Sequence, residues 1–258
     1  MQLKNIFRYF VFFIVLVSYS SVNAQGYKIK TIVIDAGHGG VKPGPKGNFS
    51  WEKDVALKVA LKLGAKLQEE LPSIKIIQTR KTDVDVDWYK RAEIANDAKA
   101  DLFISIHCNS MPPGNSHVRG TETFVGAYRR INEMDAGLKE NEEIIKDKNY
   151  KKKGTFDPTD PEEMILLSLY KSLYRSKSLS LARHIQKNYT EVNKRVNRGV
   201  KEQGLLILQR AAMPSVLTEI GFISNADEEK YINSDEGQEE IITAIVNAVK
   251  QYKKEVEN

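Results

Sequence analysis

The sequence predicts a single α/β domain built on a mostly parallel, twisted sheet flanked by helices. Short apolar runs end abruptly in polar or glycine residues at residues 31–34, 102–106 and 216–217. Amphipathic helical patterns alternate with such runs, and this alternation is typical of crossover connections between parallel strands. The chain has 258 residues and is 41% hydrophobic, which is enough to form a full core.

Hydrophobic periodicity assigns the individual elements. Apolar residues recur every three or four positions in the predicted helices, which cover residues 53–71, 87–98, 164–174, 179–196 and 238–253. β-branched or apolar runs mark the predicted strands, which cover residues 31–34, 74–79, 102–106, 121–125, 205–208 and 216–217. The strand at 121–125 is a candidate edge strand. Pro72 ends the first helix, because proline cannot continue it.

Residues 1–24 have the pattern of a Sec signal peptide cut after Ala24. Lys4 and Arg8 provide a positive start, an apolar run follows at residues 9–17, and small residues precede the expected cleavage site. A retained membrane anchor is the alternative, but the apolar run is well short of the ~20 residues that a span requires. We therefore expect export to the periplasm or cell envelope, and a mature chain, residues 25–258, without a membrane span.

Charge and cysteine content argue against a nucleic-acid-binding protein and against a protein stabilised by disulfides. The formal net charge is +5 and falls by two without Lys4 and Arg8, which is too small to indicate a nucleic-acid partner. Cys108 is the only cysteine, so no internal disulfide can form. Cys108 follows His107 directly, and neighbouring strand residues point to opposite faces, so we do not expect Cys108 in the same site as His107.

Metal-ligating residue types stand where the predicted strands end. His38 lies in a glycine-rich stretch after the first strand, His107 follows the third, and Glu52 lies at the start of the first long helix. Ligands bind at the carboxyl ends of strands in open α/β sheets, and zinc in hydrolases takes three His or carboxylate ligands and keeps one position for water. Glu219 interrupts another apolar strand and is free to act as general base and acid. Each residue alone could be structural: His38 or His107 a hydrogen-bonding residue at a strand end, Glu52 a favourable charge at a helix start.

Motifs along nearly the whole mature chain resemble one family. They are IDAGHGG, the Glu52-Lys53 pair, TRKTDVDVDWYKRAEIAN, SIHCNS, RGVK and MPSVLTEIGFISN, in this order. Together they resemble the zinc-dependent N-acetylmuramoyl-L-alanine amidases, which trim bacterial cell walls in remodelling or daughter-cell separation. The resemblance implies that His38, Glu52 and His107 hold Zn²⁺ and that Glu219 is the catalytic carboxylate. It also implies the substrate, peptidoglycan, and the reaction, hydrolysis of the amide between N-acetylmuramic acid and the L-alanine of the stem peptide.

Two other functions use the same residues. A peptidoglycan-binding module would keep the fold and lose turnover, but none of the four chemical positions is missing. A zinc carboxypeptidase acting on the same stem peptides would also need a metal and a general base, so only the resemblance argues against it.

Residues 128–177 are expected to form a helical insertion at the active-site rim. The stretch is rich in charge, has no strand pattern, and resembles, at Glu140 to Glu142 and at FDPTDPEE, the inserts of amidases from the Bacteroidetes lineage. Its apolar helix at 164–174 could close over the zinc cleft as a regulatory lid, with Glu140 or Glu142 on the metal, until an activator protein displaces it. Alternatively, the helix packs permanently on the core and widens the substrate groove.

Overall fold

A computed structural model describes residues 27–127 and 161–258, with the side chains of 162–164 and 166–172 left out of the description. The strands are β1 (Thr31–Ala36), β2 (Lys75–Gln78), β3 (Leu102–Asn109), β4 (Thr121–Gly126), β5 (Asn197–Gln203) and β6 (Ser215–Phe222). The helices are α2 (Glu52–Glu70), α3 (Trp88–Asp97), α5 (Pro161–Glu191), α6 (Leu206–Gln209), α7 (Ala226–Asn233) and α8 (Asp235–Glu257). The signal peptide predicted at residues 1–24 lies outside the described residues.

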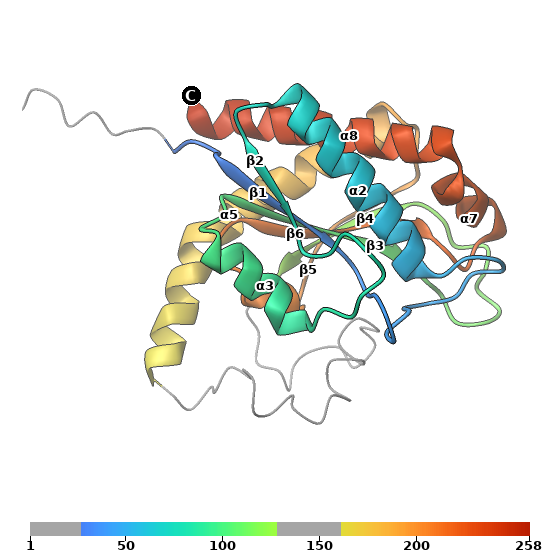
Figure 1. The fold of residues 1–258 in the computed structure, drawn as a ribbon, viewed down its shortest axis with the longest axis horizontal. Helices are drawn as coiled ribbons and strands as arrows, with labels where there is room; N and C mark the ends of the chain where they lie inside the picture. Colours follow the sequence, from blue (N-terminus) through green and yellow to red (C-terminus); the bar gives the residue numbers. More distant parts are fainter. Residues whose placement is uncertain (1–26, 128–160) are drawn as a thin grey trace, which may run out of the picture.

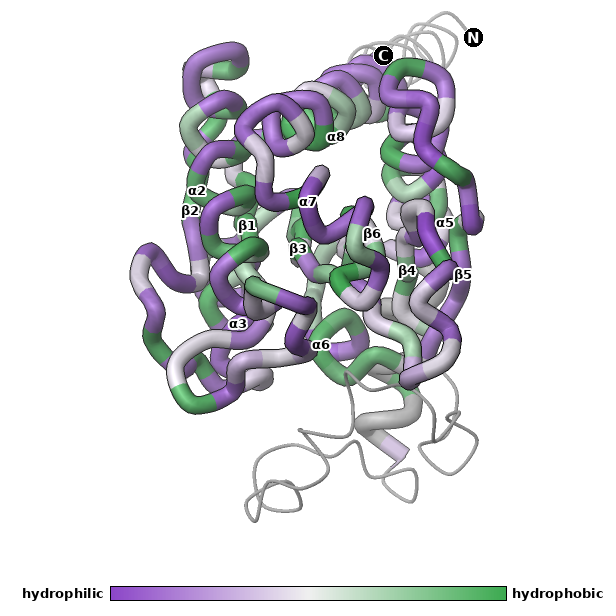
Figure 2. The backbone as a smooth tube through the Cα atoms, turned by 90° about the vertical axis from the view of Figure 1, so that its right-hand side faces the viewer, coloured by the Kyte–Doolittle hydropathy of each residue, from purple (hydrophilic) through white to green (hydrophobic). Residues whose placement is uncertain are grey.

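The six strands form one mixed sheet in the order β2-β1-β3-β6-β4-β5. All neighbouring strands are parallel except β4 and β6, which are antiparallel. Helices α2, α5 and α8 cover one face, and α3 and α6 cover the other (Figures 1 and 2). The predicted α/β architecture with a mostly parallel sheet is therefore confirmed.

Two apolar layers hold the helices to the sheet. On the α2, α5 and α8 face, Leu63, Ile185 and Ile245 pack in one fully buried cluster with side chains of the strands. On the opposite face, Phe103 and Leu208 belong to a smaller cluster under α3 and α6. Burial of each such side chain contributes about 1.5–3 kcal/mol before conformational entropy is subtracted.

Three predicted elements differ from the structure. Residues 205–208 were expected as a strand, but α6 (Leu206–Gln209) is a helix, and the strand is the preceding, polar β5. The expectation that the strand at 121–125 lies at a sheet edge is wrong, because β4 pairs with β6 on one side and β5 on the other. The helices predicted separately at 164–174 and 179–196 are one continuous helix, α5. No helix within the described ranges has the length and apolar character needed to cross a bilayer.

Candidate metal centre and active site

The three predicted metal ligands converge at the carboxyl ends of β1 and β3. His38 Nε2 lies 3.1 Å from Glu52 Oε2, and His107 Nδ1 lies 2.9 Å from Glu52 Oε1. One donor atom from each residue lies within 4.8 Å of the others. Within the described ranges, this is the only group of three His, Cys, Asp or Glu side chains arranged to share a metal ion.

Glycines keep side-chain atoms away from these donors. A Cβ at Gly44, where φ is +68°, would lie 2.7 Å from Glu52 Oε2 and 2.7 Å from His38 Cδ2. A Cβ at Gly37 would lie 2.5 Å from Nε2 of His107. Two imidazoles and one carboxylate are a donor set that zinc takes in hydrolases, where a fourth position is left for water. The residues present therefore fit a zinc ion.

Glu52 is held in place at its backbone and at its carboxylate. Its backbone N–H donates to the carbonyl of Pro45 at 3.0 Å, where the loop after β1 enters α2. Its carboxylate is fully buried, and Oε1 accepts a hydrogen bond from the backbone N–H of Cys108 at 2.9 Å. Cys108 itself points to the other face of β3, into the apolar cluster under α2, α5 and α8. Cys108 thus positions Glu52 through its backbone, while its thiol lies in the core.

His38 adopts a left-handed backbone conformation, with φ of +55°. Two arginines from outside β1 fix the backbone around it. Arg80 donates to the carbonyls of Ala36 and Gly37, and Arg91 donates to those of Ala36 and His38. A non-glycine residue with positive φ is uncommon and costs free energy, so the surrounding hydrogen bonds must stabilise it.

Asp35, the last but one residue of β1, anchors one of these arginines. It is fully buried and accepts hydrogen bonds from Arg91 Nη1 at 2.8 Å, Thr79 Oγ1 at 2.6 Å and Ser105 Oγ at 2.6 Å. Burial alone would raise the pKa of Asp35, but the charge of Arg91 and the two hydroxyls lower it below its usual value. Asp35 is therefore ionised and holds the Arg91 guanidinium against the loop that carries His38.

Glu219, the predicted catalytic carboxylate, lies on β6 next to His107. The two residues are register partners on adjacent parallel strands, and Glu219 is almost fully buried. Register partners project from the same face of a sheet, so Glu219 faces the same side as His107. The structure thus brings together all four residues selected from the sequence.

Glu122 on β4 is a buried site residue that the sequence analysis missed. It is the register partner of Glu219 across the antiparallel pair, and its carboxylate accepts hydrogen bonds from Asn109, Arg198 and Lys201. The signal that selected Glu219, a carboxylate inside a strand, applies to Glu122 too. The signal is weaker at Glu122, because its strand begins with alternating threonine and glutamate and not with an apolar run.

The predicted insertion is attached at the amino-terminal end of the parallel strands, opposite to the end that carries this site. Because β4 runs antiparallel to β6, it begins beside Glu219 and ends near the first residues of β6. There the carbonyl of Ala127 accepts a hydrogen bond from Gln209 Nε2 at 2.7 Å. Residues 128–160, including Glu140 and Glu142, lie outside the described residues. The described chain resumes in α5, whose first turns project away from the sheet (Figure 1).

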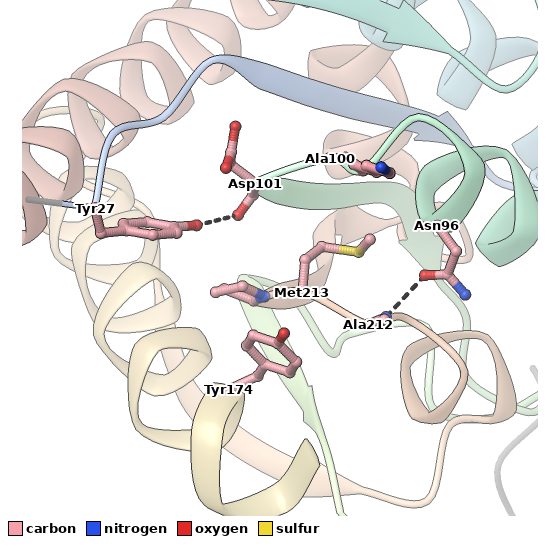
Figure 3. A pocket seen from close by; sticks show the side chains of 9 residues that line it. Tyr27, Asn96, Ala100, Asp101, Tyr174, Ala212 and Met213 are labelled. Carbon is pink, nitrogen blue, oxygen red and sulfur yellow. Dashed lines mark hydrogen bonds between the residues drawn. The ribbon is translucent and has the colours of Figure 1, made fainter. Parts of the chain in front are cut away.

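Helix α5 contacts the sheet at the same end, beside the start of β6. Tyr174 lines a pocket of about 320 Å³ together with Met213 and Pro214, which directly precede β6 (Figure 3). Ser178 Oγ then accepts a hydrogen bond from the N–H of Ser215, the first residue of β6. The expectation that the insertion leaves the sheet at the active-site rim is therefore wrong, because β4 carries the chain away from the site before residue 128. Of the two alternatives for the helix at 164–174, the structure does not support closure over the zinc cleft, because Tyr174 lies beside Met213 and Pro214 at the start of β6.

Comparisons with known proteins agree with this geometry. Residues 32–251 match the family described as N-acetylmuramoyl-L-alanine amidase. The chain is 32% identical over 224 residues to N-acetylmuramoyl-L-alanine amidase AmiA of Escherichia coli, a match that covers 86% of this chain and 76% of AmiA. The crystal structure of N-acetylmuramoyl-L-alanine amidase from Clostridium difficile 630 is similar with a TM-score of 0.65 and 26% identity, and the match covers 88% of this chain and 97% of that one.

A second similar structure contains a partner protein. It is the CwlD amidase from Clostridioides difficile in complex with the GerS lipoprotein, with a TM-score of 0.63 and 26% identity, covering 86% of this chain and 98% of that one. Both structures share the fold over nearly their full length, and the family match spans most of the present chain. This chain belongs to the N-acetylmuramoyl-L-alanine amidase family.

Proposed function

We propose that this chain is a zinc-dependent peptidoglycan hydrolase that cleaves the amide between the lactyl group of N-acetylmuramic acid and the L-alanine of the stem peptide. The observation that carries the proposal is the convergence of His38, Glu52 and His107 beside Glu219. This group lies at the carboxyl ends of the strands, where ligands of open α/β sheets bind.

His38, Glu52 and His107 would hold the zinc ion. Bound zinc lowers the pKa of a coordinated water towards neutrality and polarises a carbonyl oxygen. Glu52 brings one negative charge to the centre, and Cys108 and Arg91 fix the positions of Glu52 and His38. Such outer contacts orient the ligands before substrate arrives.

Glu219 would move the proton. Its carboxylate takes a proton as water attacks the amide carbonyl, and it returns that proton to the leaving nitrogen of L-alanine as the C–N bond breaks. The products are the free lactyl carboxylic acid and a stem peptide with an amino terminus, so one water is consumed for each bond cleaved. Glu122 on the neighbouring strand is paired with Arg198 and Lys201, so its charge next to Glu219 is compensated.

Mass spectrometry of digested sacculi tests the reaction. Free stem peptides that begin with L-alanine support the amidase. Release of terminal D-alanine would instead support a carboxypeptidase, and absence of any product, with binding to sacculi retained, would support a binding module. The Glu219→Gln variant, prepared in the same way, controls for contaminating hydrolases.

We also propose that the chain is exported to the cell envelope, where peptidoglycan lies. The support is the predicted signal peptide at residues 1–24. Cell fractionation combined with N-terminal sequencing tests it: an envelope protein that begins at Gln25 supports export, and a cytoplasmic protein that retains Lys4 and Arg8 contradicts it.

A regulatory role of the insertion and of a partner protein stays a proposal. One similar structure, CwlD with the GerS lipoprotein, contains a protein partner. Residues 161–177 belong to α5, so the test replaces residues 130–158 alone with a Gly/Ser linker. If hydrolysis of sacculi by the folded variant rises above that of the wild type, the insertion restrains the enzyme; if hydrolysis is unchanged, the proposal fails.

A further inference from the structure

A row of polar side chains continues from the metal centre across the sheet to its β5 edge. His107 on β3, Glu219 on β6 and Glu122 on β4 are successive register partners. The register between β4 and β5 shifts between Thr121 and Thr123, where Asn197 and Val200 are the partners. One residue of β4, Glu122, therefore faces two residues of β5, Arg198 and Gly199, as in a β-bulge.

Glu122 draws two cations to one point of this row. Its Oε1 accepts hydrogen bonds from Arg198 Nε at 2.7 Å and from Lys201 Nζ at 3.0 Å, and its Oε2 accepts one from Asn109 Nδ2 at 3.1 Å. The Glu122 side chain is only 5% exposed, whereas those of Arg198 and Lys201 are 36% and 41% exposed. Glu122 with its two cations therefore forms a cluster of net positive charge, and the cations lie on its solvent side.

Arg198 is held in one orientation but keeps hydrogen-bonding capacity. Its guanidinium carbon lies 5.1 Å from the centre of the Phe222 ring, so the group is fixed both by the ring and by Glu122. Within residues 27–127 and 161–258, Arg198 donates a hydrogen bond through Nε only. The two terminal nitrogens remain for a ligand, and a guanidinium with two such donors binds carboxylates in a bidentate pair.

The spacing of the sheet sets which part of a substrate could reach these cations. Neighbouring strands lie about 4.8 Å apart, so β5 is roughly 10 Å from Glu219 on β6. An extended peptide advances about 3.3–3.6 Å per residue, so this separation corresponds to about two or three residues beyond the scissile amide.

We propose that Arg198 and Lys201, organised by Glu122, form a subsite for a carboxylate carried by the second or third residue of the stem peptide. The inference rests on the proposed amidase function and adds the direction in which the peptide lies: from the metal centre across Glu219 and β4 towards β5. The alternative is that the two cations only protect an exposed edge strand, a common use of charge at such edges.

Paired substrates test the subsite. Two synthetic muramoyl peptides are compared that differ only at the second residue, with D-isoglutamate in one and its amide, D-isoglutamine, in the other. A second pair carries a free or an amidated carboxylate at the third residue.

We expect the wild type to have the lower KM for the acidic member of one pair. In Arg198→Gln and Lys201→Gln, KM for that member should rise about tenfold or more while kcat changes little, because a hydrogen bond to a charged group is lost. The difference between acid and amide should then disappear.

Arg175→Gln is the matched control. Like Arg198, Arg175 pairs with a glutamate, in this case Glu202 of β5. This pair is exposed and is not part of the row. This variant should keep the discrimination of the wild type. Circular dichroism and zinc content, measured for all variants, show whether the fold and the metal centre are intact.

The possible failures are distinguishable. If the wild type hydrolyses neither substrate, the proposed amidase function fails. If it hydrolyses both members of each pair equally, or if Arg198→Gln loses the same factor on acid and amide, the amidase function stands and the carboxylate subsite is overturned.

Discussion

Asp35 and Arg91 form a buried ion pair, with Oδ1 and Nη1 2.8 Å apart, and the same guanidinium donates to the backbone carbonyl of His38. The pair links the interior of the sheet to a residue proposed to bind the metal. His38 has a positive φ, so its side-chain direction depends on the hydrogen bonds that hold its backbone.

Replacing Arg91 should therefore weaken metal binding. We expect Arg91→Lys to lower zinc affinity by about 10- to 100-fold, the usual effect of losing an outer contact to a ligand, because lysine cannot replace the guanidinium fork. Chelator competition measures the affinity, and the d–d spectrum of the Co²⁺-substituted protein should shift. Arg195→Lys is the control, since the Arg195 side chain is buried to a similar extent but pairs with Glu228. Equal affinity and equal spectra in the two variants would contradict the positioning role.

His107→Ala should abolish stoichiometric zinc. The substitution removes one of three converging donors, and zinc sites in hydrolases use all three. Metal analysis of the purified variant checks this, with His117→Ala as control because His117 lies in an exposed loop. Near-stoichiometric zinc in His107→Ala would remove His107 from the site.

Glu219→Gln should separate binding from chemistry. The amide keeps the size of the side chain but cannot take up the proton, so turnover should fall by at least ~10²-fold while zinc content and fold are preserved. Kinetics on muramoyl peptides and metal analysis of the same sample measure both. Turnover at the wild-type rate would assign the proton transfer to another group.

Gly44→Ala should damage the metal centre more than its backbone strain explains. The new Cβ would lie 2.7 Å from Glu52 Oε2 and from His38 Cδ2, so zinc content should fall. Gly114→Ala is the control: Gly114 also has a positive φ, +91°, but its Cβ would meet nothing within 4 Å. Similar zinc content in the two variants would show that the space beside Glu52 is not needed.

Glu229 should stabilise the loop before α2 in a pH-dependent manner. It accepts hydrogen bonds from the N–H groups of Asn48, Phe49 and Ser50 and from the Ser50 hydroxyl. Burial alone would raise its pKa, but these donors lower it below the usual 4.5. A carboxylate with a depressed pKa stabilises the fold above its unfolded pKa, and this contribution is lost as pH falls through the folded pKa.

Glu229→Gln should therefore lower the free energy of unfolding by about 1–3 kcal/mol at pH 7, the usual cost of lost hydrogen bonds to a charged group. The difference from the wild type should shrink at pH values well below 4.5. Urea unfolding at pH 7 and pH 3.5 measures both differences. A difference that is the same at the two pH values would mean that the charge of Glu229 is not what stabilises the loop.

Local patterns were sufficient for the predicted ligands but not for the arrangement around them. His38 and His107 follow apolar runs directly, and Glu52 opens a clear amphipathic helix, so each position could be read from its neighbours. Glu122 gains its role from the pairing of β4 with β6, which joins residues about a hundred positions apart. Such register is a tertiary property that no local pattern encodes.

The misassigned elements have similar physical causes. Residues 205–208 are a short apolar run, and length alone cannot separate a buried helical turn from a strand. β5 was missed because it is an edge strand with a polar sequence, NRGVKEQ, and partial exposure. The predicted position of the insertion was wrong because the six residues of β4 do not reveal the direction of the strand. That direction decides at which end of the sheet residue 128 begins.

The reversed direction of β4 also separates the metal centre from the point where residue 128 begins. The chain leaves the site at Glu122 and crosses roughly 17 Å of sheet before residue 127, at about 3.4 Å per residue. A change in the length or sequence of 128–160 therefore begins at a point away from the donors around Glu52, and it need not move the proposed metal ligands.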